Sequence, residues 1–154
     1  MAHMECKTTW LGKMAFKSSI RGHEVIMDTK VESGGEDQGP SPKEMLLASI
    51  TACSGIDVAS ILQKMRVTVE LCEVSAKTET TAGYPSIFKQ VELRFDIKGP
   101  DIKADQAMKS VNLSMTKYCG VSAMVAPTSP LVYEVYLNNQ RIGDGKAHFE
   151  IPQE

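Results

Sequence analysis

The chain has 154 residues, a length typical of one domain, and 42% of them are apolar, which suffices for a sizeable core. Its 17 basic and 19 acidic side chains give a formal net charge of −2, so no broad positive field exists to hold nucleic acid. With 11 glycines, 7 prolines and no charged tail, the composition excludes disordered and fibrous classes. We therefore predict a single globular domain over residues 1–154.

Targeting signals are not evident in the sequence. Residues 1–3, which precede Met4, resemble a cloning remnant, so we exclude them from any chemistry. The N-terminus lacks the basic start and apolar core of a secretory signal, and no apolar stretch approaches the ~20 residues needed to cross a bilayer. We therefore expect a cytoplasmic protein with no membrane and no nucleic acid among its partners.

The first part of the chain predicts a small antiparallel sheet. Three short segments with strand character, over 7–10, 14–18 and 23–28, are separated by turns at Gly12 and Gly22. Residues 32–41 then contain three glycines and a proline and show no periodicity, so we expect a mobile loop there.

A helix start follows this loop. Ser41 suits the N-cap, Pro42 suits the first helical position, and Glu44 completes a capping box. From Met45 to Met65 apolar residues occupy nearly every face, so the sequence predicts a long helix that is buried in the molecule or at an interface.

The remainder predicts an α+β protein. Alternating apolar residues indicate a hairpin, with a bulge near Cys72, and periodicity and turn residues indicate two helices and a terminal hairpin around Asn138 and Asn139. These elements span, in order, 67–80, 87–97, 101–117, 121–125 and 131–142. Their order does not alternate as βα units, and no glycine-rich phosphate-binding motif is present.

The chain has four cysteines, and none of them forms a CxxC motif or a close pair with histidine. This spacing predicts neither a metal site nor a cofactor, and a reducing compartment makes a structural disulfide framework improbable. Each thiol is then either a small buried hydrophobic group or a reactive one. We expect Cys6 and Cys72, which lie in strands, to be structural.

Cys53 and Cys119 leave both interpretations open. Cys53 lies in the middle of the apolar helix, where a packed cysteine is common, and an ionised Asp57 one turn later would raise its pKa. Cys119 lies between two predicted helices, where the outward backbone N–H groups at the start of the second favour a thiolate.

Two segments carry a resemblance to a known family. The first runs from Gly39-Pro40-Ser41-Pro42 to Thr51-Ala52-Cys53, and the second is Lys117-Tyr118-Cys119-Gly120-Val121-Ser122-Ala123-Met124. Together they resemble the two signature segments of the osmotically inducible protein C and organic hydroperoxide resistance (OsmC/Ohr) family, in a less characterised OsmC-like branch.

The resemblance implies both a fold and an activity. The implied fold is an intertwined homodimer, with antiparallel sheets wrapped around long central helices. The implied activity is reduction of organic hydroperoxides in oxidative stress defence, in which Cys53 reacts with the peroxide and Cys119 resolves the sulfenic acid as a disulfide. An external dithiol then resets the pair.

The family also implies an arginine and a glutamate that stabilise the reactive thiolate. Arg21 is the only arginine before the long helix, although its context resembles a turn, and Glu44 lies one position later than the family glutamate. Lys43 occupies that family position and is an alternative cation, and Gly120 replaces a frequent proline. These departures leave a second hypothesis, a non-catalytic dimer that senses oxidation or binds a small apolar ligand, and a third, in which both cysteines are only core residues.

Overall fold

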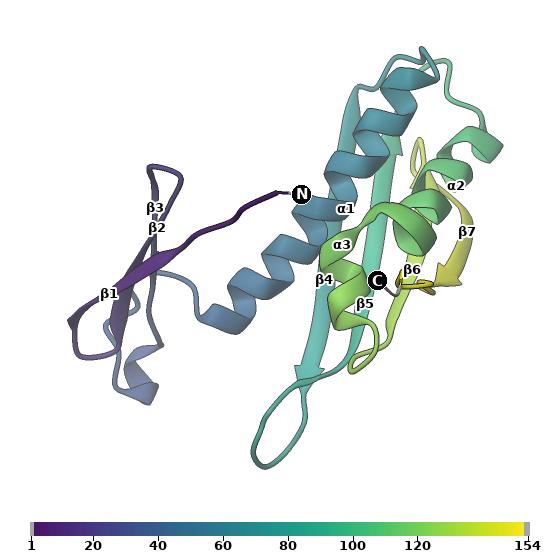
Figure 1. Cartoon of the computed structure of the whole chain (residues 1–154). Coiled ribbons are helices and arrows are strands. Elements are labelled where there is room, and N and C mark those ends of the chain that lie inside the picture. Colours follow the sequence, from purple (N-terminus) through teal and green to yellow (C-terminus); the bar gives the residue numbers. More distant parts are fainter. Residues whose placement is uncertain (1, 153–154) are drawn as a thin grey trace. The chain divides into compact units, whose positions relative to one another are not determined.

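The computed structural model describes residues 2–152 of the chain (Figure 1). The described residues fall into two compact units, Met1–Leu47 and Ala48–Glu154, whose boundary lies inside the long helix. Each unit is described by itself below. The expectation of one domain over the whole chain stays a prediction.

The first unit contains the predicted three-stranded antiparallel sheet. Its strands are β1 (Lys7–Gly12), β2 (Ala15–Ile20) and β3 (His23–Met27), in the order β1-β2-β3. The β2–β3 hairpin turns through Arg21 and Gly22, which both have positive φ angles, 53° and 80°. Positive φ at both central residues is the geometry that two-residue hairpins prefer, because it matches the strand twist.

Asp28 organises the segment that the sequence predicted as a mobile loop. Its carboxylate accepts backbone N–H bonds from Thr29, Glu36 and Gln38 at 2.7, 3.0 and 3.1 Å. The Asp28 side chain is buried, and its pKa is lowered chiefly by the bond from Gln38. A one-turn helix, η1 (Val31–Ser33), lies within the segment. The composition indicated a loop but did not indicate that one buried carboxylate holds it.

The long helix α1 spans Pro42–Lys64 and begins as predicted. The backbone N–H of Ser41 donates to Glu44 Oε2 at 2.7 Å, and the backbone N–H of Glu44 donates to Ser41 Oγ at 3.4 Å, which completes the capping box. By length and composition alone, α1 is also long and apolar enough to cross a membrane, which corrects the statement that no stretch approaches that length. Core helices of soluble proteins pass the same test.

Within the single chain, α1 buries only one stripe of its surface. Its buried residues recur every four positions, at Ile50, Ser54, Val58 and Leu62, whereas Ile56 is 70% exposed. The chain's own contacts therefore cover only part of the apolar surface of α1, and the expectation that the helix is buried in the molecule or at an interface stays a prediction.

The second unit contains a four-stranded sheet with the order β4-β5-β6-β7. Its strands are β4 (Leu71–Thr80), β5 (Phe88–Lys98), β6 (Leu131–Leu137) and β7 (Gln140–Lys146). The two predicted hairpins are confirmed, and the second turns through Asn138 and Asn139 with positive φ angles. The predicted bulge near Cys72 is wrong, because Cys72 pairs regularly with Ile97 and the register shifts between Thr78 and Thr80.

The β5–β6 pairing is parallel, unlike the other pairs in this sheet. A parallel pair needs a crossover connection, and here the chain crosses through α2 (Ala104–Leu113), the π-helical turn η2 (Ser114–Tyr118) and α3 (Gly120–Val125). The expectation of purely antiparallel sheets missed this pair, and the predicted helix over 101–117 is in fact α2 followed by η2.

In the second unit, the helices cover one face of the sheet (Figure 1). The core of this layer contains alternating strand residues, among them Leu93, Phe95 and Val135, and the helix residues Val58 and Val111. The opposite face of the sheet is charged. This arrangement places the connection between α2 and α3 in the same layer as α1.

Candidate active site

Cys53 and Asp57 are four residues apart in α1 and therefore lie on the same face of the helix, one above the other. Both side chains are half-buried. Between them, Gly55 lies close to strand β4, because an added Cβ would come within 3.4 Å of the Val74 side chain. The close approach of α1 to the sheet at Gly55 fixes this stretch of the helix.

Cys119 lies where η2 ends and α3 begins. Its backbone N–H donates to the Ser114 carbonyl at 3.0 Å, and its sulfur accepts the backbone N–H of Ser122 at 3.4 Å, as an N-cap residue does. The Cys119 side chain is completely buried. Single π-helical turns are rare and often occur at functional sites, and this one determines where Cys119 leaves the helix.

The structure brings Cys53, Cys119 and Asp57 together. The two sulfur atoms and a carboxylate oxygen all lie within 4.8 Å of one another, although Cys119 is far from the other two in the sequence. Ser114 Oγ donates to Asp57 Oδ2 at 3.0 Å, so the π-helical turn contacts both Asp57 and Cys119. We call Cys53, Asp57 and Cys119 the thiol cluster.

Cys119 is a protonated thiol at neutral pH. Burial, with a smaller contribution from the neighbouring Cys53, raises its pKa to about 11, and hydrogen bonds with the Ser122 hydroxyl and backbone N–H only partly oppose this. Its S–H donates to Ser122 Oγ at 3.0 Å. The expectation that a helix start would favour the Cys119 thiolate is therefore wrong, because the loss of solvent outweighs one backbone N–H.

Burial also raises the pKa of Asp57, and the hydrogen bond from Ser114 lowers it by less. Sequence reasoning noted Asp57 only as a neighbour that would disfavour a Cys53 thiolate. It missed the contact with Ser114 and Cys119, which depends on the crossover between β5 and β6. A polar residue one turn after a cysteine in an apolar helix was the available signal.

Arg21 and Glu44 belong to the first unit, so their assignment as the activating pair stays a prediction. Arg21 lies in the β2–β3 turn, as its context indicated, and its side chain is exposed. Glu44 is engaged in the capping box, where the N–H and hydroxyl of Ser41 lower its pKa. Lys43 is exposed in the first turn of α1.

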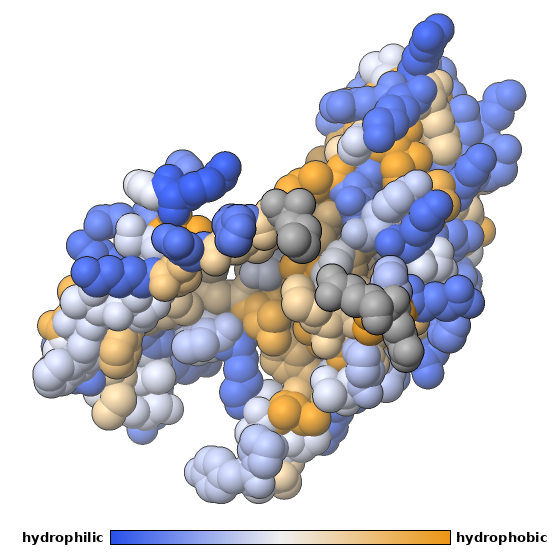
Figure 2. Space-filling view, viewed as in Figure 1, coloured by the Kyte–Doolittle hydropathy of each residue, from blue (hydrophilic) through white to orange (hydrophobic). Residues whose placement is uncertain are grey.

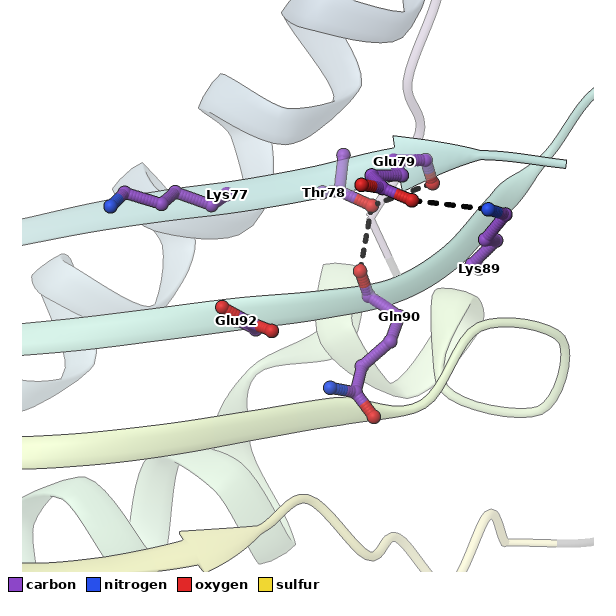
Figure 3. Close-up of a pocket in the computed structure, with 6 residues that line it drawn as sticks. All are labelled: Lys77, Thr78, Glu79, Lys89, Gln90 and Glu92. Carbon is purple, nitrogen blue, oxygen red and sulfur yellow. Dashed lines mark hydrogen bonds and ion pairs between the residues drawn. The ribbon is translucent and has the colours of Figure 1, made fainter.

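The other two cysteines lie outside the thiol cluster. Cys6 is exposed near β1, and Cys72 is half-buried in β4, where burial raises its pKa. A separate polar pocket on β4 and β5 contains no cysteine (Figure 3). Its side chains bond with each other, for example Lys89 Nζ with Glu79 Oε2 at 3.0 Å, so we do not assign chemistry to it.

The thiol cluster also has the donor types of a zinc site, namely two sulfurs and one carboxylate. The sequence did not indicate this because the donors come from separate segments. A metal ion would have to displace the proton of Cys119, whose pKa is about 11. The prediction that the chain uses no metal and no cofactor stays a prediction.

The fold and the paired thiols define a small α+β thiol protein, and comparisons with known proteins identify its family. The family model of OsmC-like proteins matches residues 34–134. Protein YhfA of Escherichia coli K12 is 37% identical over 123 residues, which are 79% of this chain and 89% of YhfA. The chain therefore belongs to the OsmC-like family, as the two cysteine segments predicted.

Solved structures agree with this fold. The crystal structure of a hypothetical protein from Aquifex aeolicus VF5 matches with a TM-score of 0.78 and 31% identity, covering 90% of this chain and 99% of that chain. An organic hydroperoxide resistance protein from Elizabethkingia anophelis matches with a TM-score of 0.63 and 18% identity, covering 89% of this chain and 94% of that chain. The second match concerns the fold alone.

Proposed function

We propose that the chain is a thiol-dependent peroxidase that reduces organic hydroperoxides through Cys53 and Cys119. The observation that carries this proposal is the approach of the two sulfurs to within 4.8 Å, with one thiol partly accessible and the other buried. Formation of a disulfide would bring the two sulfurs to the S–S bond length of about 2.05 Å. Membership of a family that includes organic hydroperoxide resistance proteins supports the same reaction.

The cycle has three steps. The Cys53 thiolate attacks one peroxide oxygen, the O–O bond breaks, and the alkoxide takes a proton and leaves as an alcohol, so that Cys53 becomes a sulfenic acid. Cys119 then attacks the Cys53 sulfur, and the S–O bond breaks with release of water and formation of a disulfide. An external dithiol reduces the disulfide by exchange and is itself oxidised.

The different burial of the two thiols supports this division of roles. A peroxide can reach only a thiol with some exposure, and Cys53 has it, whereas Cys119 is completely buried. A buried thiol with a pKa of about 11 does not react with peroxide at neutral pH. It therefore stays reduced until the neighbouring sulfur is oxidised, as a resolving thiol must.

Activation of Cys53 needs a nearby cation, and we propose Arg21 for that role, with Glu44 orienting it and Lys43 as the alternative. The Arg21 side chain is exposed and ends in a guanidinium group with five N–H donors. Replacing Arg21 or Lys43 by alanine, one at a time, should identify the group whose loss slows the first oxidation of Cys53.

We also propose that the chain acts as a homodimer. Both units expose apolar side chains (Figure 2), including Ile56 of α1 in the second unit and Trp10 and Phe16 in the first, which are 70%, 63% and 41% exposed. Apolar surface of this kind on a small protein marks an interaction site. A second copy would cover the face of α1 that the chain itself leaves exposed.

The test is a disulfide map after one equivalent of cumene hydroperoxide, compared with hydrogen peroxide, on a timescale of seconds. A Cys53–Cys119 disulfide, formed faster with the organic peroxide, supports the proposal. Cys53→Ser should abolish peroxide consumption, and Cys119→Ser should accumulate sulfenic acid on Cys53, which dimedone traps. Cys72→Ser is the matched control and should change neither.

Two outcomes would contradict the peroxidase. Equal losses in all three variants would show that the effect is structural. Oxidation of Cys53 over hours would favour a redox-sensing protein instead, an alternative consistent with the use of Glu44 as a helix cap.

A further inference from the structure

Asp57 is the third member of the thiol cluster, and the peroxidase cycle as written above gives it no role. Its carboxylate lies within 4.8 Å of both sulfurs and is half-buried. The hydroxyl of Ser114, itself completely buried, donates to Oδ2 at 3.0 Å and fixes the orientation of the carboxyl group. The same Ser114 accepts the backbone N–H of Cys119, so one residue positions the carboxylate and the resolving thiol together.

The resolving step needs a proton acceptor. Thiolates, not thiols, attack sulfur, and a pKa of about 11 leaves roughly one Cys119 in 10⁴ ionised at pH 7. The Cys119 thiol interacts with the Ser122 hydroxyl and N–H, neither of which is a base at neutral pH, and with Cys53, whose sulfur is already oxidised when the resolving step begins. Asp57 is the remaining basic group of the cluster.

We infer that Asp57 accepts the thiol proton of Cys119 during the resolving step. The inference rests on the proposed two-cysteine cycle. As the S–S bond forms and the S–O bond of the Cys53 sulfenic acid breaks, the proton moves from Cys119 to the Asp57 carboxylate and then to the leaving hydroxide. The products are the disulfide and water, and Asp57 ends the step ionised as it began.

The surroundings of Asp57 suit a group that changes its charge during the cycle. The titratable side chains facing it are Cys53 from its own helix and Cys119 from the start of α3. Burial and the Ser114 bond, rather than a charged partner, determine its pKa, so no salt bridge holds it ionised. Without a fixed opposite charge beside it, the carboxyl group can take up and release a proton without breaking an ion pair.

The test separates this role from the peroxidase activity by using DTNB, an aromatic disulfide, as the oxidant. In a chain with Cys6→Ser and Cys72→Ala, Cys53 attacks DTNB and releases a first thionitrobenzoate. Cys119 then attacks the mixed disulfide and releases the second as the Cys53–Cys119 bond forms. The rate of the second release therefore measures the resolving step without any peroxide.

Asp57→Asn keeps the size of the side chain and an oxygen that accepts the Ser114 bond, but it removes the base. We expect the second release to slow about 100-fold, within the usual range for loss of a general base. In Asp57→Asn its rate should rise tenfold per pH unit towards pH 11, because it follows the Cys119 thiolate. In the parent chain the rate should be level between pH 6 and pH 9. Asp57→Glu should restore part of the rate, and Asp105→Asn, an exposed aspartate of α2, is the control.

An unchanged rate and pH profile in Asp57→Asn would overturn the inference. If that variant does not fold, the parent chain alone decides, because a rate that rises tenfold per unit from pH 6 to pH 9 would equally overturn it. The same proteins are then mixed with cumene hydroperoxide. Absence of both sulfenic acid on Cys53 and a Cys53–Cys119 disulfide in all of them would reject the peroxidase, while the DTNB result on Asp57 would still hold.

Discussion

The burial of the Cys119 thiol makes a quantitative prediction about stability at alkaline pH. Its pKa rises from an ordinary value of 9.0 to about 11 in the folded chain. The unfolded chain therefore releases the thiol proton first as the pH rises past 9, and the free energy of unfolding falls between pH 9 and pH 11. Below pH 9 the contribution is fully present, and above pH 11 it is lost.

The magnitude follows from the pKa difference. At about 1.4 kcal/mol per pH unit, Cys119 should cost about 3 kcal/mol once the pH exceeds 11, and about half of this loss should appear between pH 8 and pH 10. Serine does not ionise in this range, so Cys119→Ser should lack this loss. The difference between the two proteins removes the effects of lysines and tyrosines common to both.

The assay is urea unfolding of both proteins at pH 8, 9 and 10, at one protein concentration because association also affects stability. The reduced state is maintained with a phosphine reductant. Parallel stability curves for the two proteins would refute the reasoning, because they would show that the Cys119 thiol titrates alike in the folded and unfolded chain. An accessible Cys119 would also remove the argument for its role as the protected, resolving thiol.

Three further predictions concern packing, association and loop order. Leu62 is completely buried, so Leu62→Ala should lower the free energy of unfolding by about 2–5 kcal/mol. Urea unfolding of the two proteins measures this difference. Ile56→Ala should instead weaken self-association in sedimentation experiments with little change in the fold, and unaltered association would argue against α1 at a dimer interface. Asp28→Asn should speed amide hydrogen exchange at Glu36 and Gln38, whose N–H groups donate to the carboxylate. In the parent chain the pKa of Asp28 is lowered, so this protection should be present above pH 3.8 and decline as the pH falls below that value.

Local signals in the sequence determined most of the elements. The capping box at Ser41 and Glu44 and the asparagine turn at residues 138 and 139 are encoded by neighbouring residues, and the structure confirms them. The parallel β5–β6 pair was not predicted, because it depends on how a crossover of three helical segments returns to the sheet. The bulge predicted near Cys72 was also wrong, because it was inferred from the order of apolar and polar residues and not from the pairing of β4 with β5.

The candidate site shows the same division between local and long-range information. Two cysteine segments sufficed to predict the thiols, but the spacing of residues along the chain does not reveal that Ser114 bonds to Asp57, 57 positions away. Nor does it reveal that burial, rather than the start of α3, dominates the pKa of Cys119. Both facts follow from the π-helical turn, which ends α2 and carries Ser114 and Cys119 towards α1. A regular α-helix, which turns about 100° per residue, would point Cys119 in a different direction from the π-helical turn. The turn, as much as the two thiols, therefore defines the site.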